Sequence, residues 1–194
     1  MQIDFYFDFL SPYAYLARHR LTELAAEHGA TIVYKPIDLG RAKLAIGNNG
    51  PANRNMPVKL SYLTTDLKRW AAIYGVPFGG IKNHNSERLN IGTFFARTDE
   101  EVAAYIKQTY DLLWGIGAAP DDEAVIRQVA RTMNWNEEKF LVFTCSAEGK
   151  AAYERSTEQA ISKGIFGVPT MMLEDQMWWG NDRIFMLEQV LKSR

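Results

Sequence analysis

A serine hydroxyl at the start of a predicted helix is the first group in the chain that could do chemistry. Ser11, Pro12 and Tyr13 follow an alternating apolar segment; Ser is a favoured N-cap, and Pro is favoured at the first helical position. The N–H groups and dipole at a helix start favour an anion and lower the pKa of a thiol placed there. The Ser11 hydroxyl could therefore donate a hydrogen bond to the thiolate of a bound molecule, or it could serve only as the cap.

Two short stretches near the end of the chain could bind the rest of such a ligand. Val168 and Pro169 precede an apolar segment, and a cis bond between them would open the backbone of Val168 to an extended peptide ligand. An ordinary trans turn proline is the alternative. Further on, the N–H groups around Gly180 and Asn181 could hold a carboxylate, and Asp182 could hold an ammonium group. These residues could also be a loop with an Asp N-cap.

A polar loop over residues 40–59 carries side chains that could hold a small carboxylate substrate. Its basic and amide groups stand among glycines: Lys43, Asn48, Asn53, Arg54, Asn55 and Lys59. His84 could donate to a substrate oxygen, and Cys145 lies in a helical run that predicts a buried thiol. For most of these residues taken singly, a solvated loop or surface position is the simpler interpretation.

Hydrophobic spacing predicts the elements that must position these groups. Residues 3–9 alternate as a strand, residues 11–29 have the start signal of a helix and a glycine stop, and residues 31–39 form a second strand. Pro36 lacks a backbone donor, so we expect the second strand at a sheet edge or at a bulge. A β-α-β unit of this length predicts a parallel pair with a right-handed crossover.

The middle of the chain changes to helical patterns, and strands return only at its end. Residues 40–59 are expected to be loop, and residues 60–163 show helical spacing without a strand signal. A hairpin over residues 170–179 and a last helix over residues 183–191 close the chain.

Joined across the helical block, these elements form an α/β fold of the thioredoxin-like type, βαβ followed by ββα, with a large all-helical insertion. We expect residues 1–40 and 164–194 to form the thioredoxin-like domain, and residues 41–163 to form a loop plus helical insertion domain. In such folds two redox cysteines lie at the start of the first helix. Ser11 and Ala14 stand at these positions, so disulfide exchange at this site is excluded.

Composition narrows the classes of function. The chain has 194 residues, 47% of them apolar, and 22 Lys and Arg balance 23 Asp and Glu. We therefore expect neither nucleic acid nor a membrane as a partner. The N-terminus lacks the basic residues of a signal peptide, and the single cysteine favours a reducing, cytoplasmic setting. No Cys and His cluster has the spacing of a metal site.

Four segments together resemble the 2-hydroxychromene-2-carboxylate isomerases, which belong with the kappa-class glutathione transferases in the DsbA-like group. The segments are FDFLSPYAYL at 7–16, NRNMPVK at 53–59, GVPT at 167–170 and WGNDR at 179–183. The resemblance covers essentially the whole chain, and the combination is specific although each segment alone is not. It implies an isomerase, expected to be a homodimer, in the breakdown of naphthalene-type aromatic compounds.

The resemblance also implies a reaction and a cofactor. Members of this family interconvert 2-hydroxychromene-2-carboxylate, a small aromatic carboxylate, and trans-o-hydroxybenzylidenepyruvate with the help of glutathione. A thiolate adds to the enone of the ring-opened form, the resulting single bond rotates, and the thiolate leaves, so that no glutathione is consumed.

Residue roles follow from the same resemblance. Ser11 is the implied catalytic residue and would stabilise the glutathione thiolate together with the helix start. Val168 would pair through its backbone with the cysteinyl part of glutathione. The γ-glutamyl end would be held by Trp179, Gly180, Asn181 and Asp182. Our candidates for binding the substrate carboxylate and oxygens are Lys43, Asn53, Arg54 and His84.

Two other functions remain open from the sequence. A kappa-type transferase would use the same thiol site but would consume glutathione by conjugating it to electrophiles. A non-catalytic thioredoxin-like module without its cysteines would bind peptides or proteins, and glutathione would not change its stability. The polar loop around Lys43 argues mildly for a small anionic substrate and against such a module.

Overall fold

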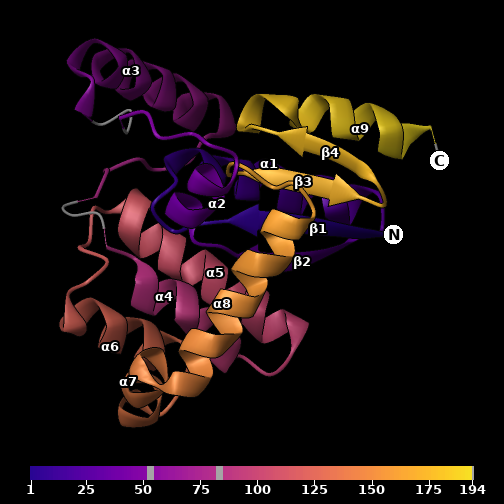
Figure 1. Cartoon of the computed structure of the whole chain (residues 1–194). Coiled ribbons are helices and arrows are strands. Elements are labelled where there is room, and N and C mark those ends of the chain that lie inside the picture. The colour runs from indigo at the N-terminus through magenta and orange to yellow at the C-terminus, as the bar shows by residue number, and fades with distance from the viewer. Residues whose placement is uncertain (52–54, 82–84, 194) are drawn as a thin grey trace.

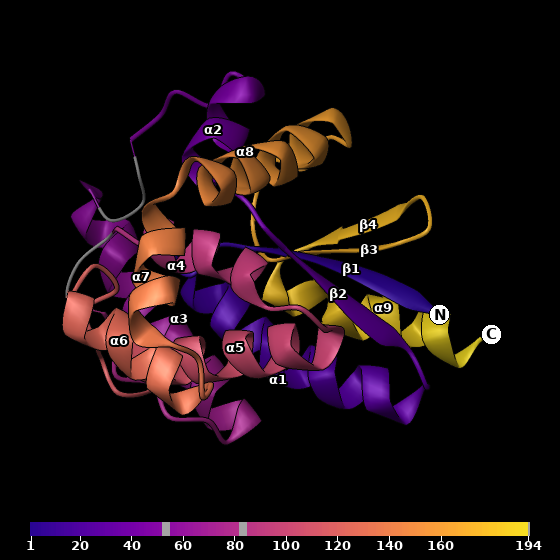
Figure 2. The same ribbon diagram turned by 90° about the horizontal axis from the view of Figure 1, so that it is seen from below.

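The computed structural model describes residues 1–51, 55–81 and 85–193, and it places a four-stranded sheet between helices (Figures 1 and 2). The strands are β1 (Gln2–Phe7), β2 (Thr31–Pro36), β3 (Thr170–Leu173) and β4 (Gln176–Trp179). Their order in the sheet is β2-β1-β3-β4. β1 pairs in parallel with β2 and antiparallel with β3, which forms a hairpin with β4. The predicted edge position of the second strand is confirmed.

Helix α1 (Pro12–Glu27) makes the crossover between the parallel strands. Ser11 is its N-cap, and Gly29 beyond its end has a φ of 59°, the left-handed conformation that a glycine stop requires. Together with α9 (Ile184–Lys192), α1 covers one face of the sheet, as Figure 2 shows. The side chains that alternate along β1 toward this face are fully buried in the main core: Ile3, Phe5 and Phe7.

The described residues between the two halves of the sheet form helices and no strand, as predicted. In chain order these are α2 (Leu39–Ala45), α3 (Pro57–Tyr74), α4 (Glu87–Gly92), η2 (Thr93–Phe95), α5 (Asp99–Tyr110), η3 (Asp111–Gly115), α6 (Glu123–Thr132), α7 (Glu137–Cys145) and α8 (Ala147–Ser162). η3 is a π-helical turn that continues α5. The division into two domains at residues 40–41 and 163–164 stays a prediction.

Helices α8 and α2 lie on the face of the sheet opposite α1 (Figure 2). Ser156 in α8 donates to the carbonyl of Pro36 at 2.7 Å, and Thr157 Oγ1 accepts from the N–H of Asp38 at 3.0 Å. These bonds tie the end of β2 to the insertion. By contrast, α3 extends past the sheet in Figure 1, and only Leu67 and Ala71 of this helix are buried. Within the described ranges, no helix combines the length and hydrophobicity that a membrane span requires.

Three details of the sequence prediction are wrong. Residues 40–45, expected to be loop, belong to α2 (Leu39–Ala45), whose short length leaves no hydrophobic period to detect. Cys145 is exposed, because α7 turns Phe140, Leu141 and Thr144 to the core instead. The last helix begins with the short turn η4 (Asn181–Arg183) without a side-chain cap, so the alternative interpretation of Asp182 as an N-cap does not hold at this described helix start.

Candidate active site

Strand register brings the candidate glutathione residues to one end of the sheet. Tyr6 in β1 pairs with Thr170 in β3, and Thr170 pairs with Trp179 in β4. Ser11 comes shortly after the end of β1, and Val168 comes just before the start of β3. The first helix start, the Val-Pro turn and the end of the hairpin therefore lie at the same edge.

Ser11 caps α1 and still has a proton to donate. Its Oγ accepts from the N–H of Ala14 at 3.1 Å, and its own N–H donates to the carbonyl of Asp8 at 2.8 Å. An accepting hydroxyl keeps its O–H for another partner, and the N–H of Tyr13 is among those that a helix start leaves without an intrahelical acceptor. The cap reading is confirmed, and it is compatible with donation to a thiolate.

The Val168–Pro169 peptide bond is cis, which was one of the two readings of this stretch. The carbonyl of Pro169 accepts from the N–H of Gly180 at 2.9 Å and so joins the turn to the end of the hairpin. Val168 is half-buried, and in the described part of the chain its N–H and C=O have no hydrogen bond. Its backbone is therefore available to a ligand.

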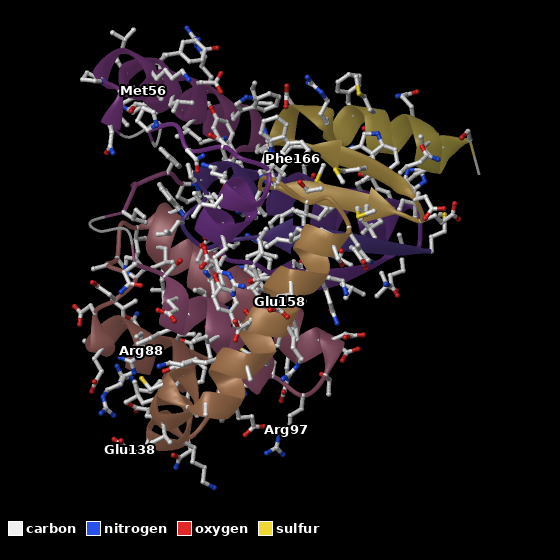
Figure 3. The ribbon with its side chains drawn as sticks, viewed as in Figure 1. Met56, Arg88, Arg97, Glu138, Glu158 and Phe166 are labelled. Atoms are coloured by element: carbon white, nitrogen blue, oxygen red, sulfur yellow. The ribbon has the colours of Figure 1, made fainter. Side chains whose placement is uncertain are left out.

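The indole of Trp179 lies against the backbone of this turn. A Cβ on Gly167 would collide with Trp179 Nε1, so only glycine allows the ring this approach. The ring of Phe166 meets the Trp179 ring edge-on with centroids 4.9 Å apart, and Figure 3 shows the labelled Phe166 beside the end of the hairpin where β3 begins. Trp179 is 53% exposed, so an aromatic surface faces solvent beside Val168.

Asn181 holds a buried donor without a partner. The side chain is 3% exposed, and its Oδ1 accepts from the hydroxyl of Tyr74 at 3.2 Å. Its Nδ2 has no hydrogen-bond partner in the described structure. Asp182 next to it is exposed and forms an ion pair with Arg183. A buried amide donor beside an exposed carboxylate matches the two charged groups of an α-amino acid end.

Helix α3 contacts both the start of α1 and the loop that holds Asn181. Tyr13 in α1 donates to Asp66 Oδ2 at 2.7 Å, while Tyr74 at the other end of α3 bonds to Asn181. Burial, followed by the hydrogen bond to Asp66, raises the pKa of the Tyr13 phenol well above its usual value. Tyr13 therefore stays protonated and holds α3 to the start of α1.

The substrate candidates are described only in part. Lys43 lies on α2, whose Ala42 belongs to a small hydrophobic cluster that Val168 packs against. The helix of Lys43 is thus close to the Val-Pro turn. Asn53, Arg54 and His84 lie outside the described residues, and their roles stay predictions.

A group of buried polar residues next to Ser11 was not predicted from the sequence. Asp8 is 4% exposed, and its carboxylate accepts from the hydroxyl of Ser86 at 2.8 Å and from Asn90 Nδ2 at 2.9 Å. Burial raises the pKa of Asp8, which the hydrogen bond from Asn90 opposes. The available signal was a lone carboxylate among phenylalanines at the end of the first strand.

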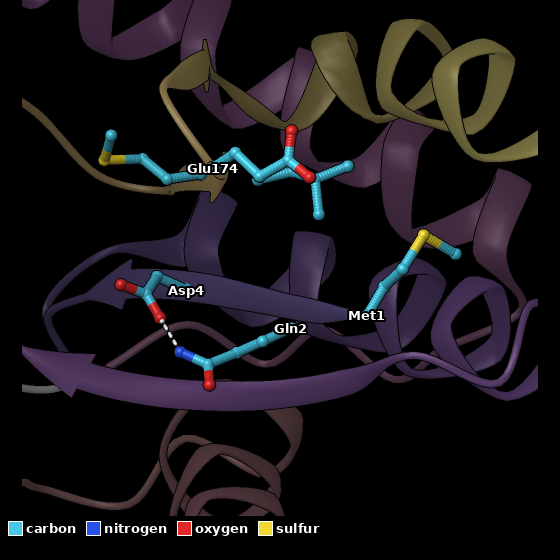
Figure 4. Close-up of a pocket in the computed structure, with 6 residues that line it drawn as sticks. Met1, Gln2, Asp4 and Glu174 are labelled. Carbon is cyan, nitrogen blue, oxygen red and sulfur yellow. Dashed lines mark hydrogen bonds between the residues drawn. The ribbon is translucent and has the colours of Figure 1, made fainter. Parts of the chain in front are cut away.

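A separate hollow of about 290 Å³ lies at the other end of β1 (Figure 4). Asp4 in its wall pairs with Lys163 at 3.5 Å and with Lys35 at 3.8 Å. Because β1 runs from this hollow toward Ser11, the hollow is not part of the candidate active site. Its lining residues are Met1, Gln2, Asp4, Met172, Leu173 and Glu174.

Comparison with known proteins relates the whole chain to one family. A family model described as a DSBA-like thioredoxin domain matches residues 2–192. A 2-hydroxychromene-2-carboxylate isomerase from Pseudomonas putida is 48% identical over 191 residues, which cover 98% of this chain and 94% of the relative. A solved structure of a 2-hydroxychromene-2-carboxylate isomerase, also 48% identical, covers 100% of this chain and 95% of its own, with a TM-score of 0.97.

A more distant relative belongs to another enzyme class. Glutathione S-transferase kappa 2 from Caenorhabditis elegans is 24% identical over 94% of this chain and 88% of the relative. The family match extends through both halves of the sheet and the helical insertion, so the predicted thioredoxin-like fold is confirmed. The chain belongs to the DSBA-like thioredoxin-domain family and, within it, to the 2-hydroxychromene-2-carboxylate isomerases.

Proposed function

We propose that this protein is an isomerase that interconverts 2-hydroxychromene-2-carboxylate and trans-o-hydroxybenzylidenepyruvate with glutathione as its thiol cofactor. The observation that carries the proposal is the 48% identity to the isomerase of Pseudomonas putida over nearly the full length of both chains. The chain has no thiol at the start of α1, where Ser11 and Ala14 stand. A thiol that acts there must therefore be brought by a bound molecule.

The described residues suit the peptide part of glutathione. The unpartnered Nδ2 of Asn181 donates to the γ-glutamyl carboxylate, and the exposed carboxylate of Asp182 takes the ammonium group. The free N–H and C=O of Val168 pair with the cysteinyl residue as one strand pairs with another. Trp179 covers this turn and excludes water from one side of it.

The start of α1 suits the sulfur. The Ser11 hydroxyl and the N–H of Tyr13 donate toward the thiolate, and the dipole of the 16-residue helix favours negative charge at the same point. The first turn of α1 contains no acidic residue that would oppose this charge. These groups lower the pKa of the bound thiol, so that more of it is thiolate at neutral pH.

When bound, glutathione supplies a nucleophilic thiol whose reversible addition turns a C=C bond into a single bond that can rotate. With glutathione bound, the Ser11 hydroxyl would hold the negative charge on the sulfur before addition and again after release, so its hydrogen bond would break once and re-form once per turnover. The substrate carboxylate and the oxygen that gains charge are held by Lys43 and, as the sequence predicts, by Asn53, Arg54 and His84.

A kappa-class glutathione transferase is the second candidate, favoured by the likeness to the Caenorhabditis elegans enzyme. Both activities need the same thiol site, and they differ in the fate of glutathione. A transferase consumes one glutathione per product, whereas an isomerase returns it. The unpartnered donor of Asn181 supports either activity over a module that binds only proteins, because it suits a small anionic ligand.

A homodimer in the cytoplasm also follows from the resemblance. Sedimentation equilibrium of the purified protein should then give twice the mass of one chain. A single-chain mass at micromolar concentration would remove the dimer from the proposal.

The requirement for a free thiol tests the cofactor. Initial rates are measured with glutathione-free protein, with added glutathione and with S-methylglutathione, which keeps the peptide and lacks the free thiol. We expect turnover only with glutathione, and competitive inhibition of that turnover by S-methylglutathione. Equal rates in all three conditions would refute the cofactor.

A further inference from the structure

The loop of residues 8–11, which presents Ser11, has each of its last three N–H groups bonded to one of two buried residues. Phe9 N–H donates to Asn90 Oδ1 at 3.2 Å, and Leu10 N–H donates to Asp8 Oδ1 at 3.0 Å. Ser11 N–H donates to the carbonyl of Asp8 at 2.8 Å. The direction of the peptide groups just before Ser11 thus depends on where Asp8 and Asn90 lie.

Asn90 in α4 joins these bonds into one network. Its Oδ1 holds Phe9 N–H, while its Nδ2 donates to Asp8 Oδ1 at 2.9 Å and to the hydroxyl of Tyr153 at 3.1 Å. Ser86 at the start of α4 donates to the same oxygen of Asp8 at 2.8 Å. Asn90 is 1% exposed, so these bonds form away from water, where each is stronger and a missing partner is more costly.

Two aromatic side chains hold the carbonyl groups of the same loop. Tyr110 donates to the carbonyl of Asp8 at 3.0 Å, and Trp114 Nε1 donates to the carbonyl of Phe9 at 2.7 Å. Tyr110 ends α5, and Trp114 lies in the π-helical turn η3, a geometry that often marks functional sites. The helical insertion therefore fastens the loop from two sides, through α4 and through the end of α5.

We propose that Asn90 is a positioning residue of the thiol site: without touching the ligand, it sets the direction of the Ser11 hydroxyl and of the first N–H groups of α1. The inference rests on the proposed function, because it concerns the thiolate that Ser11 holds. Displacements of about 1 Å in a catalytic group can lower a rate about a hundredfold. A loop that loses its bond to Asn90 therefore keeps its residues, but the Ser11 hydroxyl and the first N–H groups of α1 no longer point in the required direction.

Asn90→Leu tests this role, since leucine has a similar size and neither donates nor accepts a hydrogen bond. We expect the pKa of the bound glutathione thiol to rise by about one unit, which lowers the ratio of thiolate to thiol about tenfold, and kcat to fall by a similar factor. The affinity for glutathione should stay nearly constant, because Val168 and Asn181 hold the peptide part. Ultraviolet thiolate absorbance as a function of pH gives the first quantity, steady-state kinetics the second and calorimetry the third.

Thr93→Val is the matched control. Thr93 lies in η2 directly after α4, is 4% exposed, and its hydroxyl has no hydrogen-bond partner in the described structure. This variant should leave the thiol pKa and kcat at their wild-type values. If Asn90→Leu fails to fold, Ser86→Ala removes one donor to Asp8 and should shift the thiol pKa in the same direction, and Ser86→Thr should restore it.

The outcomes separate the inference from the proposed function. A folded Asn90→Leu protein with wild-type thiol pKa and kcat would overturn the positioning role and leave the isomerase intact. Wild-type protein that binds no glutathione would overturn both. Wild-type protein that binds glutathione without isomerising the substrate would refute the proposed function, while a raised thiol pKa in Asn90→Leu would still support the inference.

Discussion

Replacement of Ser11 by three different residues separates its capping role from its donor role. Ser11→Ala removes both the acceptor that holds Ala14 N–H and the hydroxyl donor. Ser11→Asp keeps a good N-cap, since Asp and Ser cap helices about equally well, but it replaces the donor by a negative charge. Ser11→Thr keeps both roles. Stability and turnover should therefore respond differently to the three variants.

The expected magnitudes follow from the two bonds. Loss of the cap costs about 1 kcal/mol of the free energy of unfolding. Loss of a hydrogen bond to a charged group costs about 1.5–3 kcal/mol, and at about 1.36 kcal/mol per tenfold change this lowers turnover about 10- to 150-fold. Ser11→Ala should show both losses. Ser11→Asp should keep an acceptor for the N–H of Ala14 yet lose at least as much activity as Ser11→Ala, because its charge repels the thiolate.

A second N-cap serves as the matched control for stability. Ser146 caps α8 far along the chain, and its Oγ accepts from the N–H of Gly149 at 3.0 Å. Ser146→Ala should lose about as much stability as Ser11→Ala and keep full activity. Initial rates at saturating glutathione and thermal unfolding by circular dichroism measure the two effects. Equal activity of Ser11→Ala and Ser146→Ala, or wild-type activity of Ser11→Asp, would refute the donor role.

Three further predictions concern the peptide site and the core. Gly167→Ala should displace the Trp179 indole and weaken glutathione binding in a calorimetric titration, while the melting temperature changes little. Asn181→Asp keeps the acceptor for Tyr74 but exchanges the donor for a charge, so glutathione affinity should fall about tenfold or more, whereas Tyr74→Phe should keep most of it. Burial lowers the pKa of His19 from its usual 6.5 to about 4. Between pH 6.5 and pH 4 the unfolded chain therefore binds more protons than the folded protein. The free energy of unfolding should then fall as the pH falls from 6.5 to 4. His19→Gln should flatten this pH dependence in acid unfolding curves.

The local signals of the sequence predicted most of the thioredoxin-like half. The Ser-Pro start of α1, the left-handed Gly29 and the edge position, which was one of the two alternatives indicated by Pro36, each depend on a few neighbouring residues, and each is confirmed. The loop predicted from residue 40 is wrong because α2, a helix of seven residues with one fully buried side chain, Ala42, has too little hydrophobic period to be recognised. Cys145 failed because its apolar neighbours gave no indication of which side of α7 faces the core.

The residues of the candidate site also differ in whether a local sequence pattern indicates them. Ser11, Val168 and Asn181 could be proposed from the sequence because a helix start, a Val-Pro turn and a loop before a helix can be recognised from adjacent residues. The bond from Phe9 to Asn90 spans 81 positions and depends on how the insertion packs against the loop, which no local pattern records. The unpartnered donor of Asn181 likewise depends on the tertiary contact with Tyr74.

The fate of glutathione tests the central claim most directly. The conversion of 2-hydroxychromene-2-carboxylate is followed by its ultraviolet spectrum over many turnovers, with and without glutathione, while free thiol is assayed in parallel. We expect conversion to the open trans product that requires glutathione and leaves the thiol concentration unchanged. Conversion without glutathione, or the loss of one thiol for each product formed, would contradict it.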